Sequence, residues 1–508
     1  MKQKSVIIIG AGISGLSMGS YLQMNGYSTR IFEKHAISGG LCTGWARKGY
    51  TLDGCIHWLL GSAQGSAFHK LWSELVDFKD IAFVNHSIRV YIETLKTADK
   101  HGDHVFKLYS NVDKLEEYLL DLSPEDCKPI TELIDSIRFL QKYELPPLIE
   151  KAPQLRTLAD QMHMLKLLPL IGFIKKWSKI TNKDFADRLK NPFLKEAFML
   201  LYEGKIFSML IMTMQLAYFS IGCAGFPKGG SLSLAKRLEE KYLKLGGSIL
   251  FNTGVSQVIT KDGIATGILT EDGRIESADI VVSAADWKFT VFDALDGKYS
   301  NKTIESLKNQ QILQVFDSAI LVSLGIARTF GDCPHLLRFP VRTLTLPDGS
   351  EFGRMEAHIY NYDDTMAPAG KTVVSVTLSV KNADYWIELR KTDYAKYKTI
   401  KDQIAQDVID RLESKFADIK AKVEVIDVAT PATFSRYTGN WKGSIQGWMP
   451  SEKLFSPSPV KPTLPGLKNF YMTGHWLQPG GGLPIALLTG RNISQVICKN
   501  DGKQFSVI

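Results

Sequence analysis

A glycine-rich turn near the N-terminus constrains this chain more than any other feature. Residues 5–9 are apolar and β-branched for most of their length, which predicts a buried strand. Gly10, Gly12 and Gly15 follow in the pattern G-x-G-x-x-G, and the next residues favour a helix. A second predicted strand then ends at Glu33. Strand, glycine turn, helix, strand and acid in this order predict a dinucleotide-binding βαβ unit.

Each residue of this unit has a physical role. Gly10 permits the tight turn, Gly12 lets the backbone approach a pyrophosphate, and Gly15 lets the helix pack closely on the strand. The first helical residues, Ser14 among them, face the phosphates with unpaired N–H groups and the positive end of the helix dipole. Glu33 lies 18 residues beyond Gly15, where a carboxylate can accept hydrogen bonds from a ribose. The turn by itself does not separate FAD from NAD.

The next segment favours FAD. A second paired-glycine turn, Gly39-Gly40, follows Glu33 and Lys34 closely and precedes Leu41. Paired glycines let the backbone come close to a bound nucleotide a second time, which a simple NAD domain does not need. An ordinary loop is the alternative interpretation of this turn.

Four blocks of the sequence resemble the phytoene desaturase, carotenoid isomerase and retinol saturase family of FAD enzymes. They are residues 39–54, the Phe-Pro-Lys-Gly-Gly block at 226–234, residues 246–286, and residues 469–484 with their triple glycine. The resemblance implies an α/β fold with a Rossmann-like FAD-binding domain of the glutathione reductase type. It also implies an inserted β-sheet substrate domain, a helical cap, and FAD as the cofactor.

The same resemblance implies a set of cofactor-binding residues. In such proteins the C-terminal glycine turn closes over the ribityl and isoalloxazine end of FAD, and the strand that begins at Val255 passes the adenine. The implied residues are Gly10, Gly12, Ser14, Gly15, Glu33, Lys34, Gly39, Gly40, Leu41, Val255, Gly474, Gly481, Gly482 and Leu483. Two departures affect the flavin side: Leu41 replaces an arginine found in many members, and His475-Trp476 replaces small residues.

His57 and His475 are the candidate catalytic residues, because each belongs to a segment expected near the cofactor. For each, a structural hydrogen-bonded histidine is an equally open interpretation. A flavin carries hydride itself, so the protein needs no nucleophile or metal, and the sequence has neither H-E-x-x-H nor G-x-S-x-G.

These features predict an FAD-dependent oxidoreductase that acts on carbon–carbon bonds of a long, apolar, isoprenoid or carotenoid-like molecule. Desaturation, saturation and cis–trans isomerisation stay open, and the electron acceptor or donor is not identified. The alternatives are a flavin amine oxidase-like enzyme and a non-catalytic lipid-binding flavoprotein.

The cofactor motifs fall in three separated pieces of one FAD-binding domain, residues 1–75, 222–292 and 455–508. The first insertion, residues 76–221, is mostly helix-like and is expected to form a cap and a substrate region that could face a membrane. The second, residues 293–454, has β-like runs at 318–327, 355–362 and 372–380 and is expected to bind substrate.

Charge and cysteine usage bear on location and partners. The net charge of +8 is not gathered into basic runs, which argues against nucleic-acid binding. Six scattered cysteines suit a cytoplasmic protein with reduced thiols. The uncharged residues 206–227 are better explained by a buried helix than by a membrane span. Residues 162–180 combine apolar residues, four lysines and Trp177, so contact with the inner face of a membrane and a core helix with snorkelling lysines both stay open.

Overall fold

A parallel sheet forms the centre of the nucleotide-binding domain in the computed structural model. The structure describes residues 3–143, 150–202, 207–450 and 458–507. The sheet has five strands in the order β10 (Ser248–Leu250), β2 (Ser28–Phe32), β1 (Ser5–Ile9), β14 (Ile280–Ser283) and β20 (Phe470–Met472). Three separated parts of the sequence therefore build one sheet, as the Rossmann-like prediction required.

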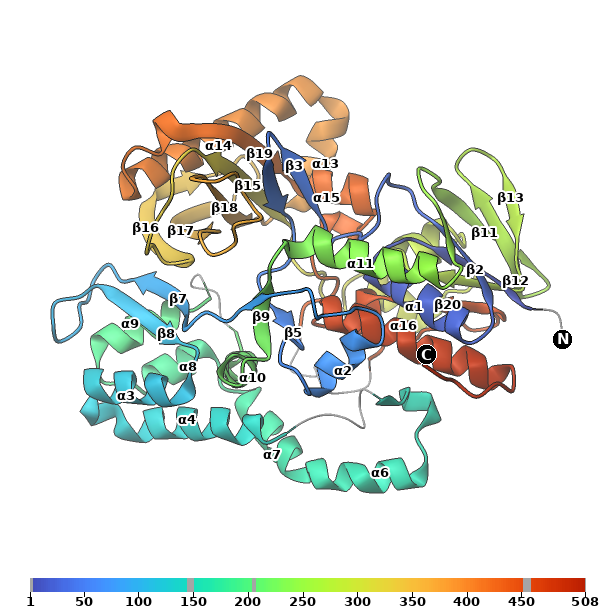
Figure 1. The fold of residues 1–508 in the computed structure, drawn as a ribbon, viewed down its shortest axis with the longest axis horizontal. Helices are drawn as coiled ribbons and strands as arrows, with labels where there is room; N and C mark the ends of the chain where they lie inside the picture. Colours follow the sequence, from blue (N-terminus) through green and yellow to red (C-terminus); the bar gives the residue numbers. More distant parts are fainter. Residues whose placement is uncertain (1–2, 144–149, 203–206, 451–457, 508) are drawn as a thin grey trace.

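The two faces of this sheet are covered differently. Val6 and Ile8 pack into one core with α1 (Ile13–Met24), α11 (Gly230–Lys244) and α16 (Leu483–Asn500). The alternate residues of β1 pack into a second core with the antiparallel sheet of β11 (Val255–Lys261), β12 (Ile264–Thr270) and β13 (Ile275–Ser277). A strand buried on both faces needs the unbroken apolar run that β1 has. Helices α1 and α16 lie side by side (Figure 1).

A seven-stranded sheet forms the second layered unit. Its order is β19 (Val423–Ala429), β15 (Ala319–Ile326), β18 (Thr372–Ser379), β17 (Glu351–Ile359), β16 (Leu336–Thr345), β7 (Ile88–Glu93) and β8 (Val105–Tyr109). Helices α13 (Ala383–Thr392) and α14 (Tyr394–Lys415) cover its core. Strands β7 and β8 come from the first insertion, and β7 pairs with β16 in parallel. The two insertions therefore share a sheet, which the sequence analysis did not anticipate.

The remainder of the first insertion is helical. Its core is built by α3 (Val112–Leu122), α4 (Cys127–Gln141), α8 (Asn182–Asp187), α9 (Pro192–Leu200) and α10 (Met209–Ser220). In the uncharged stretch at 206–227, the described residues form the buried helix α10 and then β9 (Ala224–Pro227). None of the helices in the described ranges has both the length and the apolar character needed to cross a membrane.

Shorter elements connect these units. Helices α6 (Leu158–Met164) and α7 (Leu168–Trp177) run along the lower edge of the molecule in Figure 1. The others are β3 (Gly44–Arg47), β4 (Tyr50–Asp53), β5 (Leu59–Leu60), α2 (Ala67–Ser73), β6 (Phe83–Val84), α12 (Lys302–Lys308) and α15 (Pro431–Thr438).

Candidate active site and cofactor cradle

In the first glycine turn, Gly10 and Gly15 are required by the backbone itself, whereas Gly12 is not. Gly10 has φ +97°, a conformation that side chains disfavour. A Cβ on Gly15 would lie 2.0 Å from the Gly10 carbonyl oxygen. A Cβ on Gly12 would meet nothing nearer than the Gly39 carbonyl oxygen, at 4.0 Å. The space in front of Gly12 is therefore open in the protein itself, and it is where a pyrophosphate would lie.

Glu33 is held in a fixed orientation beside this turn. Its two carboxylate oxygens accept hydrogen bonds from the backbone N–H groups of Ala11, at 2.6 Å, and His35, at 2.8 Å. Burial raises the pKa of Glu33, and the two backbone hydrogen bonds oppose that rise. A carboxylate has about four lone-pair sites, so two remain for ribose hydroxyls. The Thr253 N–H donates to the Glu33 carbonyl, which brings the chain just before Val255 to the same corner.

The second glycine turn is hydrogen-bonded to the first. The Gly39 N–H donates to the Ala11 carbonyl at 2.9 Å, and a Cβ on Gly39 would lie 2.3 Å from the Cys42 carbonyl oxygen. Leu41 follows and is half-buried, whereas Lys34 is exposed and lies 4.0 Å from Glu271. The paired glycines are thus a structural part of the cradle.

The C-terminal glycines complete the cradle from the other side. Gly474 follows β20 with φ +120°, and the neighbouring Thr473 hydroxyl is 2.7 Å from the Ser14 hydroxyl at the start of α1. Helix α16 begins after Gly482, and no side chain caps it; the same is true of α1 at Gly12. Two helix N-termini with uncapped N–H groups therefore flank one space, which is a favourable setting for phosphates and other electron-rich groups.

These observations fit FAD. An open space in front of Gly12, a carboxylate with free lone pairs and two uncapped helix N-termini are the features that a dinucleotide needs. The buried Nε2 atom of His475 has no hydrogen-bond partner in the described part of the chain, and it lies one residue beyond Gly474. Bound FAD would be held by the glycine turns, Glu33 and the two helix ends.

Comparison with known proteins identifies this cradle. The model of the family "Flavin containing amine oxidoreductase" matches residues 13–498. The chain belongs to this family. It is therefore an FAD-dependent oxidoreductase, as the sequence predicted.

Similar members of this flavoenzyme family span nearly the whole chain. The chain is 24% identical to a phytoene desaturase (lycopene-forming) of a Paracoccus species, with 97% of each chain covered. It is 25% identical to the chloroplastic prolycopene isomerase of Arabidopsis thaliana, with 95% of this chain and 81% of that protein covered. An oxidoreductase structure from Methanosarcina mazei has a TM-score of 0.59 at 17% identity, covering 97% of this chain and all of that one. A putrescine oxidase structure has a TM-score of 0.58 at 15% identity, covering 98% of this chain and 99% of that one. The structural likenesses confirm the predicted fold.

The two candidate histidines lie in different surroundings. Burial lowers the pKa of His475 to about 4, and the His57 pKa is lowered to about 3 by desolvation and then by His358. The His57 ring is nevertheless accessible to solvent. Neighbouring protein atoms desolvate the His57 ring, which packs against the His358 ring, although part of the residue stays accessible. Both histidines are neutral at pH 7.

His57 adjoins a buried charged network that the sequence analysis missed. Its ring centroid is 4.2 Å from that of His358, whose Nε2 is 2.9 Å from a Glu356 oxygen. Arg338 lies opposite Glu356 on the paired strands β16 and β17 and forms an ion pair with it. Burial raises the Glu356 pKa, but Arg338 and His358 outweigh this and hold it well below its usual range.

A second pair of histidines lies next to this network. The His86 and His335 rings stack with centroids 3.4 Å apart, and Tyr362 packs edge-on against both. Burial is the main cause that lowers the His86 pKa to about 4 and the His335 pKa to about 2, and the positive charge of Arg89 adds to it. These histidines come from β-linking segments far apart in the sequence, so no local motif marked them.

The stacked pair predicts a loss of stability at mildly acidic pH. Both folded-state pKa values lie below the unfolded value of about 6.5, so the unfolded chain binds protons first as the pH falls. The stabilisation that the neutral pair contributes is fully present above about pH 6.5 and is lost progressively as the pH falls toward 4. Between pH 7.5 and 5.5 we expect the pair to contribute a decrease of about 3 kcal/mol in the free energy of unfolding. Urea titrations at both pH values measure it.

The double variant His86→Phe/His335→Phe should remove that part of the pH dependence, because phenylalanine rings stack without titrating. His101 is exposed and serves as the control position. His101→Phe should leave the pH dependence as in the wild type. An unchanged slope in the double variant would contradict the assignment to the stacked pair.

Proposed function

We propose that this flavoenzyme changes carbon–carbon bonds in a long, apolar, isoprenoid-like molecule. The observation that carries the proposal is the set of relatives that span the chain, which includes phytoene desaturase and prolycopene isomerase. Bound FAD would supply hydride transfer, and the protein would supply orientation and exclusion of water. His57 lies between the cofactor cradle and the seven-stranded sheet, because it follows β4 and its ring contacts that of His358 on β17.

His57 and His475 are proposed to face the reacting centre. Their lowered pKa values keep both rings neutral at pH 7, so each offers one donor and one acceptor nitrogen and no fixed charge. The His475 Nε2 has no hydrogen-bond partner among the described residues, so it is suited to a hydrogen bond with the bound cofactor or to proton exchange with a substrate carbon. In this proposal His57 positions the substrate from the side of the seven-stranded sheet.

The flavin spectrum tests the reaction. Oxidised holoenzyme is titrated without oxygen with saturated and polyene isoprenoid hydrocarbons in liposomes. Bleaching of the flavin band would identify desaturation, and reoxidation of the dithionite-reduced enzyme by a polyene would identify saturation. A change in cis–trans composition with no net redox change would identify isomerisation. If putrescine bleaches the flavin and releases hydrogen peroxide while the isoprenoids leave the flavin unchanged, the protein is an amine oxidase and the proposal is wrong. If isoprenoids bind without any change in the flavin or in themselves, the protein is a lipid-binding flavoprotein.

His475→Leu should retain FAD but slow the reaction. The substitution removes the ring nitrogen while keeping an apolar side chain in a mainly buried position. Loss of a positioned proton-transfer group costs about 100-fold or more in rate, so we expect the single-turnover rate to fall by about 100-fold or more. The measurement is single-turnover flavin kinetics with FAD content quantified by absorbance. A wild-type rate would remove His475 from the reacting centre.

We also propose that α6 and α7 rest on a membrane surface, with the protein in the cytoplasm. Five large apolar side chains along these helices are each more than half exposed: Leu158, Met162, Leu165, Leu168 and Ile171. Lys175 and Lys179 are also exposed at the end of this apolar strip. Apolar residues flanked by lysines are typical of helices that lie in the interface of anionic bilayers.

Leu168→Asp/Ile171→Asp should weaken this attachment. Two carboxylates in the apolar strip oppose both burial in lipid and attraction to anionic headgroups. We expect at least a tenfold decrease in co-sedimentation with vesicles of phosphatidylserine and phosphatidylcholine. Leu95 is 62% exposed and lies on another part of the surface, so Leu95→Asp is the matched control. Equal binding of all three proteins would refute the membrane proposal.

A further inference from the structure

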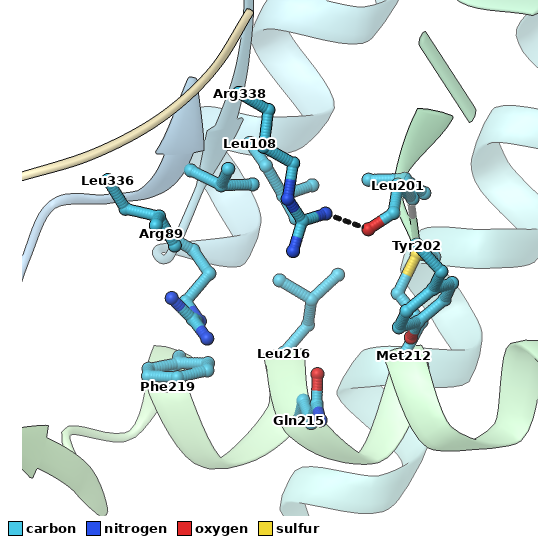
Figure 2. Close-up of a pocket in the computed structure, with 11 residues that line it drawn as sticks. Arg89, Leu108, Leu201, Tyr202, Met212, Gln215, Leu216, Phe219, Leu336 and Arg338 are labelled. Atoms are coloured by element: carbon cyan, nitrogen blue, oxygen red, sulfur yellow. Dashed lines mark hydrogen bonds between the residues drawn. The ribbon is translucent and has the colours of Figure 1, made fainter. Parts of the chain in front are cut away.

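A small cavity lies where the helical insertion meets the seven-stranded sheet. Figure 2 shows the Arg89 and Arg338 guanidinium groups directed into one space, with residues of α10 on the opposite side. The cavity volume is about 40 Å³. Its apolar wall consists of Val90, Leu108, Leu201, Met212, Leu216, Phe219 and Leu336. Arg89, Arg338, Tyr202 and Gln215 supply its polar groups.

The two arginines differ in what they bind. Arg338 forms an ion pair with Glu356 and donates to the Leu201 carbonyl oxygen, a bond drawn in Figure 2. In the described ranges Arg89 has neither a hydrogen bond nor an ion pair for its guanidinium group, which lies 5.1 Å above the Phe219 ring. Burial lowers the Arg89 pKa to about 10, and the charge of the nearby Glu356 opposes that fall only in part, so the group stays charged at pH 7. Glu356 is paired directly with Arg338, so it neutralises Arg89 only from a distance, and a ligand that supplies a second negative charge would stabilise the two arginines.

Tyr202 presents a second unsatisfied group to the same cavity. Its hydroxyl is buried and has no hydrogen-bond partner among the residues that the structure describes. Buried polar groups in native proteins nearly always have hydrogen-bond partners. The Tyr202 hydroxyl and the Arg89 guanidinium lack them within the described residues, which indicates that a ligand supplies them. The Arg89 guanidinium and the Tyr202 hydroxyl together offer N–H and O–H donors to one small volume, which suits an oxygen anion.

We infer that this cavity binds a carboxylate at one end of the apolar substrate, with the Arg89 guanidinium as its counter-ion. The inference rests on the proposed function and narrows its substrate to a long-chain acid. A volume of about 40 Å³ holds roughly three waters, which accommodates a carboxylate but not a chain. Arginine matches a carboxylate with two parallel N–H donors, and Leu108 and Leu216 can contact the first methylenes.

The cavity adjoins the proposed reaction site. The Phe219 ring, which forms part of its wall, packs edge-on against Trp58 with centroids 5.4 Å apart. Trp58 follows His57 in the chain, and the Arg89 and Arg338 charges are close enough to affect the His57 pKa. A ligand anchored at Arg89 would therefore extend its apolar chain past Phe219 toward Trp58 and His57.

Ligand binding to the holoenzyme tests the inference. Geranylgeranoic acid, geranylgeraniol and the matching C20 hydrocarbon are compared at pH 7.5 by quenching of tryptophan fluorescence. We expect the acid to bind about 10- to 100-fold more tightly than the alcohol, the range that a charge-assisted hydrogen bond gives. Arg89→Met should abolish this preference while binding the hydrocarbon as before, and Arg89→Lys should restore part of it.

Arg342→Met is the matched control, because Arg342 is an exposed arginine on the same strand as Arg338. Arg342→Met should keep the full preference for the acid over the alcohol. All variants should contain the same amount of FAD per chain as the wild type. Palmitate tests whether the ligand is an isoprenoid acid or a fatty acid. If palmitate binds as tightly as geranylgeranoic acid, the carboxylate site is supported and its ligand is a fatty acid. Equal binding of acid and alcohol by the wild type would overturn the inference. If isoprenoid hydrocarbons still alter the flavin, the proposed function survives that failure.

Discussion

Gly12→Val is expected to give a folded protein that has lost FAD. The valine Cβ meets no protein atom within 4 Å except the Gly39 carbonyl oxygen at that distance, and the Gly12 backbone at φ −69° and ψ 174° suits any residue. The added side chain instead occupies the space of the pyrophosphate. We expect affinity for FAD to fall at least about 100-fold, measured as flavin per protein after purification and by titration of the apoprotein.

Two other glycines make this test specific. Gly353 lies in β17 with open space around it and no positive φ, so Gly353→Val should retain a full complement of FAD. At Gly15 the added Cβ would collide with the Gly10 carbonyl, so even Gly15→Ala should impair folding itself. A yellow Gly12→Val protein with one flavin per chain would show that the cradle is misplaced.

Glu356→Ala should strongly destabilise the seven-stranded sheet. The carboxylate is buried. One of its oxygens pairs with Arg338 on the neighbouring strand, and the other is 2.9 Å from the Nε2 of His358. Removing it takes away the buried counter-ion of Arg338, which typically costs about 3 kcal/mol or more. Urea or thermal unfolding measures the loss.

An exposed carboxylate on the same strand provides the control. Glu351 lies at the start of β17 and is exposed, so Glu351→Ala should change stability by less than about 0.5 kcal/mol.

The stabilisation by Glu356 depends on pH. Because the Glu356 pKa is depressed in the folded protein, this stabilisation is present above the unfolded pKa and is lost as the pH falls through the folded pKa. Similar unfolding midpoints for the two variants would contradict a stabilising role for the buried pair.

Local sequence was sufficient where neighbouring residues decide the structure. The strand predicted before Gly10, the β-like runs at 318–327 and 372–380, and the cofactor turn all appear as expected, as β1, β15, β18 and the loop into α1. Turn chemistry and strand periodicity act over a few residues, so a single sequence carries them.

The sequence by itself determined the nucleotide-binding unit, the choice of FAD and the order of the pieces. Only the tertiary structure decided that β7 joins β16, that Arg338 meets Glu356 and that Arg89 forms no direct ion pair within the described chain. Those contacts join residues more than a hundred positions apart or on neighbouring strands whose register the sequence does not state. Pairing of a buried charge depends on which strands become neighbours, and that is settled by packing of the whole fold.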